Sequence, residues 1–170
     1  MNTPGVTTAH EPVVVVRIGE LHVLRREGVL VAIGLGSCVG VALYDPVRRI
    51  AGMAHVFLPA SQNGYFPSDA PAKYADTGVP ALVSAMRDAG ASPRYLVAKI
   101  AGGAQLFLRG EQSALDVGRR NAEAVRAALK SLGIEIVAAD VGGSRGRTMR
   151  LYADSGRVVV TTLGQESREL

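Results

Sequence analysis

A cysteine and a histidine are the two side chains of this sequence whose types and settings suit covalent catalysis. Cys38 is the single cysteine, and it ends the run Gly34-Leu-Gly-Ser-Cys38. A thiol is a strong nucleophile only as the thiolate, and a neighbouring histidine can take its proton and pair with the anion. His55 follows in the run Gly52-Met-Ala-His55. The pair predicts acyl transfer, with Cys38 as nucleophile and His55 as base.

The glycines before the cysteine favour a backbone that turns sharply and comes close to a substrate. Such a turn leaves backbone N–H groups free to hold an oxyanion, and Gly36 and Ser37 are the candidates for this role. Taken alone, the glycine spacing is a weak signal. A lone cysteine in an apolar stretch is more often a small buried core residue, and a histidine on a strand is more often structural.

A metal site is a poorer interpretation of the same residues. The soft ligands of the chain are Cys38 and three histidines, His10, His22 and His55. No two of these four residues have the short spacing of a zinc motif. We therefore expect no metal site, and acyl transfer through Cys38 and His55 needs no organic cofactor.

The segments around the two residues predict a β-hairpin that brings them together. Residues 39–44 and 50–57 are apolar runs, and Asp45-Pro46 between them is a turn signal. The two arms are similar in length. Cys38 and His55 are therefore expected to lie near each other at the same end of the hairpin.

The rest of the chain predicts a single domain with further strands and two main helices. Apolar runs predict strands over residues 13–18, 21–24, 29–33, 95–100, 134–141, 148–152 and 157–160. Helical spacing of apolar residues predicts one helix around residues 79–86, ended by Gly90. A second is expected around residues 122–132, capped by Asp116 and ended by Gly133.

Hairpins dominate the connections between these strands, and only strands bridged by a helix are candidates for parallel pairing. The pattern predicts an α/β domain over residues 13–162, with mixed, largely antiparallel sheets and the helices packed against them. Residues 1–12 and 163–170 are interpreted as tails, the first of them disordered.

Composition and charge argue against other classes of function. The formal net charge of +4 is mild, and the basic residues are scattered, unlike the dense stripe of a nucleic-acid binder. The tightest cluster, Arg145, Arg147 and Arg150, is interpreted as a solvated hairpin edge rather than a phosphate-binding patch. One cysteine allows no intrachain disulfide and fits a reducing compartment. No signal peptide and no membrane-spanning run is evident, so we expect a soluble cytoplasmic protein without membrane insertion.

Six runs along the chain stand out as possible family signatures. They are Gly34-Leu-Gly-Ser-Cys-Val-Gly-Val-Ala-Leu-Tyr-Asp45, Gly52-Met-Ala-His-Val-Phe-Leu-Pro59, Lys73-Tyr-Ala-Asp76, Lys99-Ile-Ala-Gly-Gly-Ala-Gln105, Gly118-Arg-Arg-Asn121, and Asp140-Val-Gly-Gly143 with Gly146-Arg147 just after it. They resemble the sequence signatures of the CheD family of chemoreceptor glutamine deamidases. The runs occur in register over nearly the whole expected domain, so the resemblance is specific.

The resemblance implies a fold, an activity and partners. Members of the family are α/β sandwiches similar to the catalytic domains of deamidating bacterial toxins. They are amidohydrolases that convert particular glutamines of methyl-accepting chemotaxis receptors to glutamates. The family's nucleophile and base fall on Cys38 and His55, which implies a Cys38 thioester with His55 as general base and acid. In some bacteria a CheC phosphatase binds the deamidase.

One position departs from the family pattern. The family commonly carries a threonine as third catalytic residue where this chain has Ala32, whose methyl group cannot accept a hydrogen bond from an imidazole. Either a backbone carbonyl orients His55, or the protein is a weak or inactive adaptor that binds chemoreceptors or CheC. The first interpretation is favoured because Cys38, His55 and both glycines are present. It predicts a thiol unusually reactive at neutral pH, which an adaptor does not require. A nucleic-acid binder is a distant third.

Overall fold

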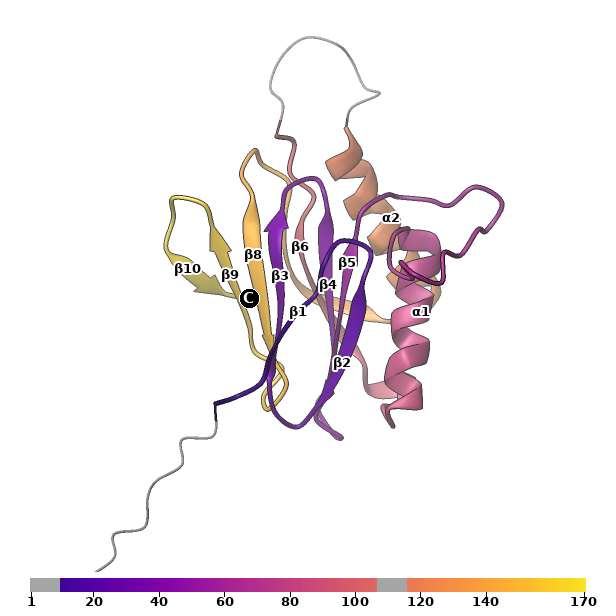
Figure 1. Cartoon of the computed structure of the whole chain (residues 1–170), viewed down its shortest axis with the longest axis vertical. Coiled ribbons are helices and arrows are strands. Elements are labelled where there is room, and N and C mark those ends of the chain that lie inside the picture. The colour runs from indigo at the N-terminus through magenta and orange to yellow at the C-terminus, as the bar shows by residue number, and fades with distance from the viewer. Residues whose placement is uncertain (1–9, 107–115) are drawn as a thin grey trace, which may run out of the picture.

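The chain is described by a computed structural model over residues 10–106 and 116–170. These residues form two five-stranded β-sheets, two α-helices and the short 3-10 helix η1 (Pro93–Tyr95) (Figure 1). The predicted α/β class with two main helices is confirmed. Neither α-helix in the described ranges is long and apolar enough to cross a membrane.

The first sheet, called here the outer sheet, has the strand order β1-β3-β8-β9-β10. Its strands are β1 (Val13–Val15), β3 (Val29–Leu35), β8 (Arg147–Tyr152), β9 (Val158–Thr162) and β10 (Ser167–Glu169). β1 pairs parallel with β3, and the other neighbours are antiparallel. The predicted hairpin of β8 and β9 is confirmed.

The second sheet, called here the central sheet, has the order β2-β5-β4-β6-β7. Its strands are β2 (Leu21–Arg25), β4 (Val39–Asp45), β5 (Ile50–Val56), β6 (Val97–Gly102) and β7 (Glu135–Val141). The predicted hairpin of β4 and β5 is confirmed. Only β6 and β7 pair parallel, and α2 bridges them. Both sheets are therefore mixed and largely antiparallel, as predicted.

The two helices, α1 (Ala75–Asp88) and α2 (Val117–Ser131), begin and end close to the predicted positions. The carboxylate of Asp116 accepts the N–H of Arg119 at 3.2 Å and so caps α2. Past the C-terminal ends of the helices, Gly90 and Gly133 have φ values of +104° and +69°, in the left-handed region that favours glycine.

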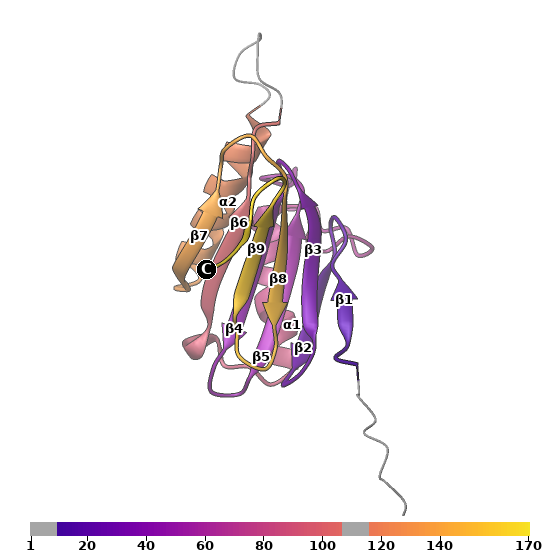
Figure 2. The ribbon, with the colours of Figure 1, turned by 90° about the vertical axis from the view of Figure 1, so that its left-hand side faces the viewer.

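The central sheet lies between the helices and the outer sheet (Figures 1 and 2). Val41 and Leu43 of β4 belong to the apolar cluster that packs against α1 and α2. Ala42 of β4 and Met53 of β5 belong to the cluster shared with the outer sheet. Every residue of β4 and β5 is buried, which explains why these strands read as continuous apolar runs.

The C-terminal residues differ from the tail expected over 163–170. β10 pairs with β9, the N–H of Leu170 donates to the carbonyl of Val158 at 3.0 Å, and the Lys99 ammonium donates to the carbonyl of Leu170 at 2.7 Å. All three residues of β10 are exposed, so no apolar alternation marks the strand in the sequence. Most of the expected N-terminal tail falls on residues 1–9, outside the described residues.

Candidate active site

Cys38 and His55 lie on the face of the central sheet that packs against the outer sheet. Gly40 of β4 pairs directly with His55 of β5, and Cys38 comes two residues before Gly40. Side chains two residues apart share a face, so Cys38 and His55 are diagonal neighbours. Gly40 puts no side chain between them. The hairpin therefore places the two candidate residues at the same end and on the same face of the sheet.

The imidazole of His55 is held by a backbone carbonyl. His55 is 1% exposed, and its Nδ1 lies 3.0 Å from the carbonyl oxygen of Val16. A carbonyl only accepts, so Nδ1 carries the proton and Nε2 is left as the basic nitrogen. Within the described part of the chain, Nε2 has no hydrogen-bond partner. This is the tautomer that a general base towards a thiol requires.

Val16 is positioned by the outer sheet, next to the place where the family threonine is missing. Its N–H donates to the carbonyl of Val31 at 2.8 Å, which extends the pairing of β1 with β3 by one residue. Ala32 follows Val31 and is fully buried in the cluster that also contains Val16 and Cys38. The Val16 carbonyl thus serves as the acceptor that the Ala32 methyl group cannot provide.

Burial favours the neutral form of both candidate groups. It raises the pKa of the Cys38 thiol, against a smaller lowering by the backbone N–H of Cys38 itself. It also lowers the pKa of His55, against smaller opposing effects of the Val16 carbonyl and the Glu20 carboxylate. The direction of the Cys38 shift runs against the expected thiol of unusual reactivity at neutral pH, which stays a prediction.

Residues 36–38, called here the nucleophile loop after the role predicted for Cys38, follow a bulge in β3. The pairing of β3 with β8 shifts register between Ala32 and Leu35, where Gly34 has a φ of +70°. The N–H of Gly36 donates to the carbonyl of Gly34 at 2.9 Å, so this predicted oxyanion donor is already engaged. Among the described residues, no backbone carbonyl accepts the N–H of Ser37 or of Cys38. The N–H of Ser37 therefore stays a candidate donor, and the N–H of Cys38 becomes a second one.

Asn121 of α2 connects the segment before Cys38 with the segment after His55. It is fully buried, and its Nδ2 donates to the carbonyls of Ser37 and Phe57, each at 2.9 Å. Ser37 directly precedes Cys38. Phe57 lies two residues after His55, just past the end of β5. Sequence reasoning gave Asn121 no role. The only signal was its place in the Gly118–Asn121 run.

The end of β6 closes over the nucleophile from the other side. The N–H of Gly103 donates to the carbonyl of Cys38 at 2.8 Å, and the N–H of Ala104 donates to that of Gly36 at 2.7 Å. Gly102 has a φ of +111°, and a Cβ added there would overlap the carbonyl oxygen of Cys38. Gly102 is therefore required both for its conformation and for this close approach.

Comparison with known proteins identifies the family. The sequence model of a family described as CheD chemotactic sensory transduction matches residues 57–162. A probable chemoreceptor glutamine deamidase CheD of Symbiobacterium thermophilum is 55% identical over 157 residues, which cover 91% of this chain and 95% of the relative. The chemoreceptor glutamine deamidase CheD of Thermotoga maritima is 44% identical over 150 residues, which cover 88% and 92%. The chain, as its sequence signatures indicate, belongs to the CheD family.

Proposed function

We propose that this protein is a cytoplasmic amidohydrolase that converts particular glutamines of methyl-accepting chemotaxis receptors to glutamates. Relatives at 44–55% identity are named for chemoreceptor glutamine deamidation. The observation that carries the proposal is the geometry of His55. Its Nδ1 is fixed by the Val16 carbonyl, and its Nε2 has no other partner among the described residues, on the sheet face it shares with Cys38.

The reaction begins from the neutral pair. The Cys38 sulfur attacks the carboxamide carbon of the glutamine, and the thiol proton passes to Nε2 of His55. The amide C=O π bond opens and its oxygen becomes an oxyanion. The backbone N–H groups of Ser37 and Cys38 are the proposed donors to that oxygen. Because the thiolate forms only as the C–S bond forms, the raised pKa of free Cys38 is compatible with catalysis.

The imidazolium of His55 then gives its proton to the amide nitrogen, and the C–N bond breaks to release ammonia. The remaining intermediate is a thioester of Cys38. A water molecule gives one proton to Nε2 and adds to the thioester carbon. The C–S bond breaks, and His55 returns the proton to sulfur. The sum is glutamine plus water to glutamate plus ammonia, with Cys38 and His55 regenerated and no cofactor consumed.

The test is the intact mass of a chemoreceptor cytoplasmic fragment incubated with the wild-type protein or with Cys38→Ala. Each conversion adds about one dalton and one negative charge, which also separates on a gel. We expect the shift with wild type only. A shift of equal size with Cys38→Ala would contradict the nucleophile assignment.

A non-catalytic adaptor is the second candidate function, and Ala32 is the observation that favours it. Such an adaptor would bind chemoreceptors or a CheC phosphatase without chemistry. It predicts that wild type and Cys38→Ala pull down the receptor fragment equally and that neither shifts its mass. For this result to count, a threonine-containing relative must deamidate the same fragment.

A further inference from the structure

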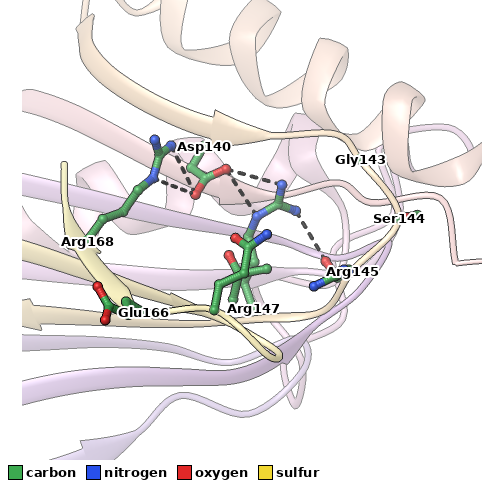
Figure 3. Close-up of a pocket in the computed structure, with 9 residues that line it drawn as sticks. Asp140, Gly143, Ser144, Arg145, Arg147, Glu166 and Arg168 are labelled. Carbon is green, nitrogen blue, oxygen red and sulfur yellow. Dashed lines mark hydrogen bonds and ion pairs between the residues drawn. The ribbon is translucent and has the colours of Figure 1, made fainter.

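Arg147 is a buried cation at the edge of the nucleophile loop. The basic cluster that contains it was interpreted from sequence as a solvated hairpin edge, but Arg147 is only 8% exposed, so that interpretation is wrong for this residue. Its Nε donates to the Asp140 carboxylate at 3.2 Å (Figure 3). Its Nη2 donates to the carbonyl of Gly142 at 2.7 Å. Its Nη1 donates to the carbonyl of Gly102 at 3.3 Å.

These contacts join the two sheets at the end where the nucleophile lies. Arg147 belongs to β8 of the outer sheet, whereas Asp140 and Gly102 belong to β7 and β6 of the central sheet. Arg147 also pairs with Leu35, the last residue of β3 before the nucleophile loop. Arg147 therefore connects the strand that enters the loop, through its backbone, with the strand that closes over it, through its guanidinium.

The contact with Gly102 reaches the nucleophile through one peptide. The carbonyl of Gly102 accepts from Arg147 and also from the N–H of Gly142, at 2.9 Å. The same peptide unit supplies the N–H of Gly103 that donates to the carbonyl of Cys38. Because a peptide is planar, holding its carbonyl oxygen fixes the direction of its N–H.

We propose that Arg147, held by Asp140, is a positioning residue for deamidation: it fixes the 102–103 peptide against Cys38 and so sets where the nucleophile stands relative to His55. A buried ion pair contributes little net stability compared with apolar packing. Multidentate, charge-assisted hydrogen bonds, by contrast, fix geometry closely. The inference rests on the proposed function for its catalytic readout only.

The chain offers a matched pair of arginines for the test. Arg168 donates to the same Asp140 carboxylate at 3.1 Å, but it is an exposed residue with no hydrogen bond to Gly102 (Figure 3). The variants are Arg147→Lys, which keeps the charge but loses the planar fork, and Arg168→Ala. Both are assayed at a temperature where circular dichroism shows them folded.

For receptor deamidation, Arg147→Lys should lower kcat by about tenfold to a hundredfold, the usual cost of a small misplacement of reacting groups. KM should stay within about twofold of wild type, because the proposed role is to position the reacting groups and not to bind the receptor. A residue that only supports the fold would not separate kcat from KM in this way. Arg168→Ala should leave both constants unchanged. A folded Arg147→Lys with wild-type kcat, or equal losses in the two variants, would overturn the proposal.

Alkylation of Cys38 by iodoacetamide is the second readout, and it needs no receptor. The sulfur is nearly buried, so a loosened 102–103 peptide should raise the alkylation rate several-fold in Arg147→Lys and not in Arg168→Ala. An unchanged alkylation rate in Arg147→Lys overturns the proposal that Arg147 fixes the 102–103 peptide, even if the protein proves to have no deamidase activity. Failure of this proposal and failure of the proposed function are therefore distinguishable. If Arg147→Lys does not fold, Asp140→Asn takes its place, and wild-type values for it overturn the proposal.

Discussion

At the scale of single residues, His55 is oriented by a backbone carbonyl oxygen, an atom that every residue has. A carboxylate in this role would both orient the imidazole and stabilise its charged form. The Val16 carbonyl, at 3.0 Å from Nδ1, fixes the tautomer and the ring position but carries no full charge. Burial lowers the pKa of His55 and favours the neutral imidazole, against a smaller opposing effect of the hydrogen bond to Val16. The side chain at position 32 is then relieved of an orienting role.

Restoring the family threonine should therefore bring no gain in catalysis. We expect Ala32→Thr to leave kcat within about threefold of wild type, because the Val16 carbonyl already occupies Nδ1. It should lower the free energy of unfolding by about 1–3 kcal/mol, because Ala32 is fully buried in a packed core. Steady-state deamidation and urea unfolding measure the two effects. Ala32→Val is the control of equal shape without the hydroxyl, and a tenfold rise in kcat for Thr but not Val would contradict this reading.

At the scale of elements, three segments meet at one end of the central sheet: the nucleophile loop, the end of β6 and the first turns of α2. Glycines permit the approach of α2 to β6, since a Cβ on Gly118 would lie 2.6 Å from the carbonyl oxygen of Gly103. That approach brings Asn121 to the carbonyls on either side of the site. The helix thereby supplies two hydrogen bonds that hold the nucleophile and base segments in register.

Alanine substitutions at Gly133 and Gly102 should distinguish the cost of backbone strain from the cost of steric overlap. Gly133→Ala, at a φ of +69° with no atom within 4 Å, should cost about 1–2 kcal/mol in urea unfolding from the left-handed conformation alone. Gly102→Ala adds the overlap with Cys38, and we expect about 3–5 kcal/mol and loss of deamidation. Equal costs for the two variants would show that the β6 end moves freely away from the nucleophile.

The elements predicted from sequence were those with a local signature. The β4–β5 hairpin has apolar arms around Asp45-Pro46, and α2 has its cap at Asp116 and its stop at Gly133, so each could be read without tertiary contacts. β10 could not, because its stability comes from hydrogen bonds to β9 and not from an apolar pattern.

The supporting part of the site lies beyond such reasoning for a different reason. A backbone acceptor such as the Val16 carbonyl has no sequence signature, and it reaches His55 only because β1 joins the outer sheet while β2 joins the central one. Asn121 and Arg147 resemble solvated polar residues until the fold buries them. Cys38 and His55 could be predicted as a candidate pair because their chemistry, unlike that of their supports, is a property of the side chain itself.

At the scale of the whole molecule, the sandwich encloses an ionisable ring in its interior, and folding stability should fall on mild acidification. Burial lowers the pKa of His55 below its ordinary value of 6.5, so the unfolded chain binds a proton at a pH where the folded protein does not. The contribution of the neutral His55 to the free energy of unfolding is complete above about pH 6.5, and it is lost as the pH falls through the folded pKa. For one proton the slope approaches about 1.4 kcal/mol per pH unit.

His55→Gln isolates this effect, because its amide can donate to the Val16 carbonyl but cannot titrate. The pKa values of Glu20 and Asp116 are lowered, mainly by hydrogen bonds from the Arg17 backbone and the Arg119 side chain, so their contributions are lost only in the more acidic carboxyl range. Urea unfolding between about pH 7.5 and 5 should therefore show a steep loss of stability in wild type and a shallow one in His55→Gln. Parallel curves would mean that the ring takes up its proton without leaving the interior. The pKa of His55 would then be nearly the same in the folded and the unfolded chain, and burial would not be what favours the neutral imidazole.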